Sequence, residues 1–194
     1  MRAPHVTVAW SVLLVLGLAA CGSGDRTAPS TPAVAAAPAA APAAAMPIEG
    51  VAFTEENRQF LTQAIQSGLA EVELARLARD RTESRAVRGF AQLMVDDHSA
   101  ANQQLTALAN AAGVTPPTQP DQAHQNLYAQ LSALSGPAFD RAYMQGQVLD
   151  HQQAVDLFAR QARGNDQVAR FATQQLPVLQ RHLSMAQAIS ETLR

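Results

Sequence analysis

Three histidines of the chain occupy positions where a helical hydrophobic pattern calls for apolar side chains. They are His98, His151 and His182, and each lies in a row of apolar residues that recur at steps of three and four. A polar ring that faces a hydrophobic core needs a partner for its nitrogens. Nitrogen-rich sites favour later transition metals such as Zn²⁺, Fe²⁺ and Cu²⁺ over Mg²⁺ or Ca²⁺. The pattern therefore predicts a site for one transition-metal ion.

A fourth polar residue, Glu71, interrupts the apolar row of the first predicted helix, whereas Glu73 falls on its polar face. Counting the helical rise from the connecting turns places all four polar residues in the middle third of their helices, with a scatter of about 10 Å along the axis. We expect side-chain reach to absorb this scatter. The predicted metal ligands are Glu71, His98, His151 and His182.

Two carboxylates directly precede histidines of this set, Asp97 before His98 and Asp150 before His151. They could be additional ligands, or they could accept a hydrogen bond from the second ring nitrogen of a ligand. Asp140 lies more than two turns from His151 and is interpreted as a helix-start carboxylate or a network member. The predicted supporting network is Asp97, Asp150, Asp140 and Tyr143.

A metal-free interpretation of the same residues stays open. Each histidine could donate a core hydrogen bond to a carboxylate or a backbone carbonyl, and Glu71 could pair with one imidazolium. Such a buried polar network would select the helix register without chemistry. The remaining histidine of the folded part, His124, is predicted to be a solvated surface residue outside any site.

The elements that must position these side chains are helices. Apolar spacing predicts long helices at residues 54–80, 83–112, 137–163 and 166–193, and a short amphipathic piece at 121–134 within the connection between the second and third. No strand-like alternation is present in this part. The fold class is therefore predicted to be all-α, with four long helices forming a four-helix bundle.

Capping residues, glycine and proline set the predicted helix ends. Thr54 is a predicted N-cap, Gly113 a predicted stop and Pro137 a first-turn proline. Pro177 lies inside the last helix and is predicted to bend it by removing one hydrogen bond of the helical ladder.

The first fifty residues differ in kind from the rest. An apolar run at residues 6–20 has the layout of a secretory signal and is too short to span a bilayer comfortably. Its end, Leu18-Ala19-Ala20-Cys21, resembles the lipobox of bacterial lipoproteins, which implies cleavage before Cys21 and lipidation of that thiol. The alternative is an ordinary cleaved signal that leaves a free thiol. Residues 21–52 are rich in Ala and Pro and are predicted to form a tether to a folded domain at 53–194.

Charge and cysteine content exclude some classes of function. The formal net charge is −2 and no run is rich in Lys or Arg, so we expect no nucleic-acid partner. The chain has one cysteine, so it cannot form an internal disulfide. No nucleophile motif or phosphate-binding loop is present. We therefore expect a non-enzymatic protein, with the membrane as partner through a lipidated Cys21.

Several short strings resemble a family of bacterial envelope proteins that carry a domain of unknown function. The resemblance covers residues 60–193 and implies a ferritin-like bundle with a long connection between the second and third long helices, without implying an activity. It implies an exported protein, and Gly22 after the anchor favours the outer membrane, facing the periplasm. The strings are Gly68-Leu69-Ala70-Glu71, residues 90–98, Phe139-Asp140-Arg141-Ala142-Tyr143, His151, Leu176-Pro177 and His182-Leu183.

The chain departs from ferritin-like di-iron proteins, which use Glu-x-x-His pairs. The residues three before the predicted histidine ligands are Val95, Val148 and Leu179. A di-iron centre and its oxygen chemistry are therefore not expected. The sequence predicts a lipid-anchored envelope protein that binds one transition metal (Zn, Fe or Cu) for storage or stress protection, with a structural or interaction module of the envelope as the alternative.

Overall fold

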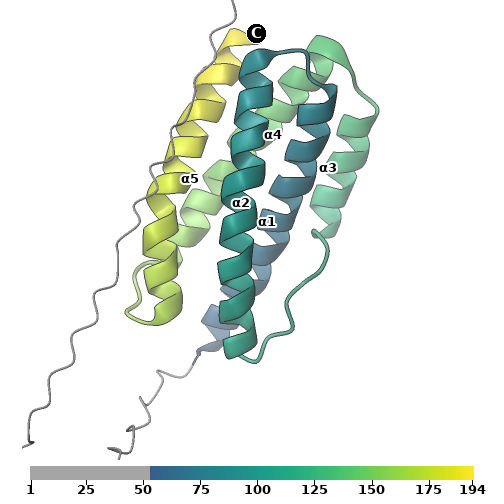
Figure 1. Cartoon of the computed structure of the whole chain (residues 1–194). Coiled ribbons are helices and arrows are strands. Elements are labelled where there is room, and N and C mark those ends of the chain that lie inside the picture. The colour runs from purple at the N-terminus through teal and green to yellow at the C-terminus, as the bar shows by residue number, and fades with distance from the viewer. Residues whose placement is uncertain (1–52) are drawn as a thin grey trace, which may run out of the picture. The chain divides into compact units, whose positions relative to one another are not determined.

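The computed structural model describes residues 53–194, which fold into five helices without a strand (Figure 1). The predicted signal, Cys21 and the tether lie outside the described residues. Among the described helices, none is long and apolar enough to cross a membrane. The helices are α1 (Glu55–Arg81), α2 (Arg85–Ala111), α3 (Gln122–Ser132), α4 (Gly136–Gln161) and α5 (Gln167–Thr192).

The ends of the helices follow the local chemistry of the sequence. The Thr54 hydroxyl accepts a hydrogen bond from the backbone of Asn57, and the Asn57 side chain accepts one from the backbone of Thr54. The carboxylates of Asp121 and Asp166 cap α3 and α5, each by accepting a hydrogen bond from the backbone N–H three residues later. Gly113 has a φ of 70°, the left-handed conformation in which glycine ends a helix. The four long helices begin and end within about two residues of the predicted bounds.

The long helices form two hairpins, α1 with α2 and α4 with α5. The hairpins pack through α1 against α4 and through α2 against α5, and the short α3 lies against α1 and α4 (Figure 1). The four predicted long helices are confirmed, with the short connecting helix covering one side. Pro177 lies inside α5, which continues on both sides of it, and the predicted bend stays a prediction.

Two apolar clusters fill the interior of the bundle. On each long helix the two clusters occupy different segments, as α2 illustrates with Leu105 in the first cluster and Met94 in the second. His98 lies between them on the same helix. The first cluster centres on Phe60, Leu61, Ile65, Leu105, Phe158, Phe171 and Leu179, and the second on Leu74, Phe90, Met94, Leu131, Phe139, Tyr143 and Met144.

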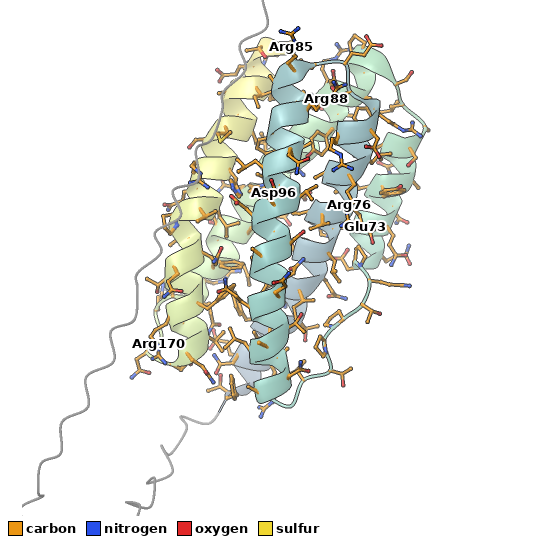
Figure 2. The ribbon with its side chains drawn as sticks, in the orientation of Figure 1. Glu73, Arg76, Arg85, Arg88, Asp96 and Arg170 are labelled. Carbon is orange, nitrogen blue, oxygen red and sulfur yellow. The ribbon has the colours of Figure 1, made fainter. Side chains whose placement is uncertain are left out.

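The outer faces of the helices are polar, as the periodicity predicts. Glu73 is exposed on α1, one position along from buried Val72. Figure 2 shows Glu73 and Arg76 on α1 and Asp96 midway along α2. Charged side chains therefore cover the outside of the helices whose inner faces hold the two apolar clusters and the polar residues between them.

Candidate metal centre

The rings of His98, His151 and His182 meet in the core, and we call this group the histidine triangle. Its ring centres are 5.5 Å apart for His98 and His151, 5.6 Å for His98 and His182, and 5.4 Å for His151 and His182. One ring nitrogen of each residue lies within 4.8 Å of the other two. Helices α2, α4 and α5 thus bring together three of the four residues whose predicted heights scattered by about 10 Å.

The dimensions of the histidine triangle match those of a metal site. A metal–nitrogen bond of about 2.0–2.1 Å places an imidazole centre about 3.2 Å from the ion, so three rings arranged in a plane around it would have centres about 5.5 Å apart. The measured separations are 5.4, 5.5 and 5.6 Å. The spacing of the three rings is therefore the spacing expected for three imidazoles around one ion.

Two of the rings are held by a hydrogen bond at one nitrogen. His151 Nδ1 donates to the carbonyl oxygen of Gln147, one turn earlier on α4, at 3.0 Å. His182 Nε2 donates to Asp97 Oδ2 on α2 at 2.8 Å. These bonds assign the proton to the bonded nitrogen of each ring and leave the other nitrogen with a free lone pair.

The remaining nitrogens have no hydrogen-bond partner. His151 Nε2, His182 Nδ1 and His98 Nε2 are each buried and unpaired among the described residues. Leaving one such polar atom buried costs about 1–3 kcal/mol. Each ring of the triangle thus has one buried nitrogen without a partner among the described residues.

Burial keeps the three rings in the form that binds metals. It lowers the pKa of His98 well below the usual 6.5, and the neighbouring rings of His151 and His182 lower it further. Burial likewise lowers the pKa of His151, and it lowers the pKa of His182 to about 4 although Asp97 acts in the opposite direction. All three rings are thus neutral at pH 7, as metal ligation requires.

Glu71 lies behind His151, outside the histidine triangle. Its Oε1 is 3.6 Å from His151 Nδ1, whose N–H already donates to the carbonyl oxygen of Gln147. Its Oε2 accepts a hydrogen bond from Gln147 Nε2 at 2.8 Å. Burial raises the pKa of Glu71 to about 7. The geometry places this carboxylate where it supports the orientation of His151, and its predicted role as a direct ligand stays a prediction.

The carboxylates next to the ligands differ in what they contact. Asp97 accepts from His182 and also from exposed Arg181 at 3.2 Å, so it orients a ring of the triangle. Asp150 lies 3.8 Å from His124 Nε2 instead, and its Oδ2 is buried without a partner. Burial, together with the nearby Glu71 carboxyl group, raises the pKa of Asp150 to about 6.

Asp140 and Tyr143 are buried near the start of α4. Tyr143 belongs to the second apolar cluster, where its ring stacks on Phe139 and meets Phe90 edge-on. Burial raises the pKa of the Tyr143 hydroxyl well above 10. Asp140 Oδ1 and the Tyr143 hydroxyl have no hydrogen-bond partner among the described residues, so their predicted place in the supporting network stays a prediction.

His124 is a residue whose role the sequence prediction missed. Its side chain is 17% exposed, with Nδ1 2.9 Å from Asp121 Oδ2, so it is not a solvated surface residue. It lines an open cleft of about 530 Å³ together with Asp121 and Asp150. The spacing Asp121-x-x-His124, at the start of a helix, was the signal that could have indicated the contact with Asp121. The contact with Asp150 depends on how α3 packs on α4.

Comparisons with known proteins give a family and a fold. The model of a domain of unknown function, DUF4142, matches residues 36–189. Among curated proteins there is no match. A DUF305 fragment from Deinococcus radiodurans is similar in structure, with a TM-score of 0.65 and 20% identity over 72% of this chain and 97% of the fragment. A DUF305 protein from Streptomyces coelicolor whose name describes it as secreted has a TM-score of 0.58 and 14% identity, over 68% of this chain and 87% of that one. At these identities the two structures support the helical fold alone.

Proposed function

The chain belongs to the DUF4142 family, and we propose that it binds one transition-metal ion at the histidine triangle. Two facts about the triangle carry this proposal. Its three neutral imidazoles, from three helices, bring one ring nitrogen each within 4.8 Å of the others. Each ring also has one buried nitrogen without a hydrogen-bond partner among the described residues. Asp97 and the Gln147 carbonyl hold the opposite nitrogens of two of these rings, which is the arrangement that orients histidine ligands in metal sites.

The donor set restricts the metal. Three imidazole nitrogens suit Zn²⁺, Fe²⁺ or Cu²⁺, and three protein ligands leave a coordination position for a small molecule. Two carboxylates approach rings of the triangle, Glu71 at His151 Nδ1 and Asp97 at His182 Nε2. Both of these nitrogens already donate a hydrogen bond. This set favours one ion over a carboxylate-bridged pair. We assign the bundle to the ferritin-like architecture with its helical connection between α2 and α4.

We place this metal-binding domain in the cell envelope. The apolar run at residues 6–20 and the sole cysteine at its end support export and attachment to a membrane through a lipid on Cys21. The outer membrane, with the domain facing the periplasm, is the proposed location, and metal storage or protection against metal stress is the proposed role. Replacing Cys21 by serine should abolish labelling with radioactive palmitate, and labelling that persists would contradict the anchor.

The experiment for the metal itself is elemental analysis of protein purified without an affinity tag. We expect roughly one equivalent of metal per chain after exposure to Zn²⁺, Cu²⁺ or Fe²⁺, the last under anaerobic conditions. The His124→Gln variant is a matched control, because it removes an imidazole outside the triangle. Less than about a tenth of an equivalent of every metal in the wild-type protein would contradict the proposal.

A second candidate is a structural or interaction module of the envelope. The contacts of His182 with Asp97 and of Gln147 with Glu71 favour it, because they link helices through buried polar groups without any ion. This candidate predicts that His98→Leu folds and keeps its cellular role. The metal proposal predicts a folded variant that has lost both metal and role.

A further inference from the structure

A small cavity adjoins the histidine triangle on the side of His98 and His182. Its volume is about 30 Å³, and all four long helices contribute to its wall. A single water needs about 10–15 Å³ measured in this way, so the cavity has room for a ligand of two or three heavy atoms. His151 does not line it, so the cavity borders two rings of the triangle without being enclosed by the third.

One wall of the cavity carries an amide without a partner. Asn102 follows His98 by four residues on α2, so both side chains lie on the same face of that helix. The Asn102 Oδ1 atom is buried and has no hydrogen-bond partner. It is an acceptor, so it lacks a group that donates a hydrogen bond.

Gly68 of α1 leaves the space that the Asn102 side chain occupies. A Cβ atom at position 68 would collide with Asn102 Oδ1, so only glycine lets this amide lie where it does. Other glycines on helix faces have no such constraint, and a Cβ atom at Gly89 of α2 would meet nothing within 4 Å. The close approach at Gly68 thus preserves a polar atom in the cavity wall where an alanine would displace it.

The cavity adjoins the open cleft of His124. Ser67 of α1 and Ala154 of α4 line both the cavity and this cleft. Two small side chains therefore belong to the walls of both spaces, and we expect a small molecule to enter the cavity past them.

We propose that this cavity binds a small oxygen ligand of the metal, such as water, hydroxide or hydrogen peroxide, with Asn102 accepting its hydrogen bond. The inference rests on the proposed function, because the ligand is held by two interactions, coordination to the metal and a hydrogen bond to Asn102. The cavity volume sets the size of the ligand, and the unpaired acceptor of Asn102 requires that it carry an O–H group. The route past Ser67 and Ala154 lets the ligand exchange.

The test uses the folded protein loaded with Co²⁺, and azide as the probe of the cavity and the open coordination position. Azide carries no hydrogen, so it reports the space beside the metal and not the hydrogen bond to Asn102. Elemental analysis first gives the cobalt content, and an optical titration then gives the dissociation constant of azide. For Gly68→Ala we expect unchanged cobalt content and azide binding weakened by about tenfold or more, because the new methyl drives Asn102 into the cavity. Gly89→Ala is the matched control and should bind azide like the wild type.

The outcomes separate the two proposals. Loaded wild-type protein that does not bind azide, or equal azide binding in Gly68→Ala and Gly89→Ala, would overturn the cavity assignment and leave the metal site in place. Wild-type protein that takes up no cobalt would overturn the proposed function and this inference with it. If Gly68→Ala does not fold, Ala154→Val tests the same cavity, since it narrows the wall and should slow azide association. An unchanged association rate would then overturn the inference.

Discussion

His124 and the histidines of the triangle carry the same imidazole ring but differ in the partners of their ring nitrogens. Both ring nitrogens of His124 face carboxylates, Asp121 at 2.9 Å and Asp150 at 3.8 Å, at the edge of an open cleft. In the triangle, each ring has one buried nitrogen without a hydrogen-bond partner among the described residues. His124 has its partners within the chain, whereas the triangle needs one from outside.

This difference shows which histidines have nitrogens that are available to a ligand. A folded chain pairs nearly all its buried polar groups, because each unpaired one costs about 1–3 kcal/mol. His124 lies in the first turn of α3 and its partner Asp121 is the N-cap of that helix, so the two residues are neighbours through local structure alone. At the triangle the chain buries three unpaired nitrogens together, a cost that a metal ion would remove.

Replacing a ring of the triangle should have the largest effect. We expect His151→Leu to weaken metal binding by more than about 100-fold, because it removes a ligand, whereas His124→Leu should change it by less than about threefold. Equilibrium dialysis against a metal buffer measures both, with circular dichroism as the check of folding. Equal losses in the two variants would contradict the distinction between the two kinds of histidine.

Removing the support of a ring should have the next largest effect. Asp97→Ala leaves His182 without its acceptor, so metal affinity should fall by about 10–100-fold. Asp96→Ala is the matched control, because Asp96 is exposed on the adjacent position of α2 and contacts no histidine (Figure 2). Metal affinity that is unchanged in Asp97→Ala would show that the bond to His182 does not orient a ligand.

The pH dependence of stability tests the neutral state of the triangle in the metal-free protein. Burial lowers the pKa of His182 from 6.5 to about 4, so its contribution to stability is complete above pH 6.5 and is lost as the pH falls towards 4. The free energy of unfolding of the wild type relative to His182→Gln should fall by about 3 kcal/mol over that window. Urea denaturation measures it.

The difference in the free energy of unfolding between the wild type and His182→Gln separates the contribution of His182 from that of Glu71. The raised pKa of Glu71, about 7, gives stability below pH 4.5 that is lost as the pH rises through 7, which is the opposite sign. Because Glu71 is present in both proteins, its contribution largely cancels. A difference that stays constant from pH 7 to 4 would contradict the buried, neutral state of His182.

The smallest effect is expected at Arg181. Its side chain is 57% exposed and lies 3.2 Å from Asp97, which is itself 32% exposed. Exposed ion pairs contribute about 0–1 kcal/mol, so Arg181→Gln should change metal affinity by less than about threefold. A loss as large as that of Asp97→Ala would mean that the position of Asp97 depends on this arginine.

The sequence predicted the helices well because their signals are local. Thr54, Asp121 and Asp166 cap their helices through bonds that span only three residues, and apolar periodicity needs no knowledge of the tertiary structure. The inward direction of His151 and His182 followed from the same periodicity, and both are buried. What periodicity does not contain is the axial stagger and tilt of one helix against another.

That missing information explains where the site prediction and the geometry differ. Glu71 faces the core as predicted, but the packing of α1 on α4 brings it to the bonded side of His151. Asp150 could not be assigned to His124 from the sequence, because the contact joins α4 to α3 across 26 residues of chain. The sequence also could not predict which ring nitrogens lack a hydrogen-bond partner, because that depends on the side chains that the neighbouring helices place beside each ring.

The most direct test of the account is nitrogen-15 NMR of the histidine rings while Zn²⁺ is added to metal-free protein. The account predicts large shifts at His98 Nε2, His151 Nε2 and His182 Nδ1 that are complete at about one equivalent, with the opposite nitrogens of His151 and His182 still protonated and His124 unchanged. Shifts confined to His124, or no shift at any nitrogen of the triangle, would contradict it.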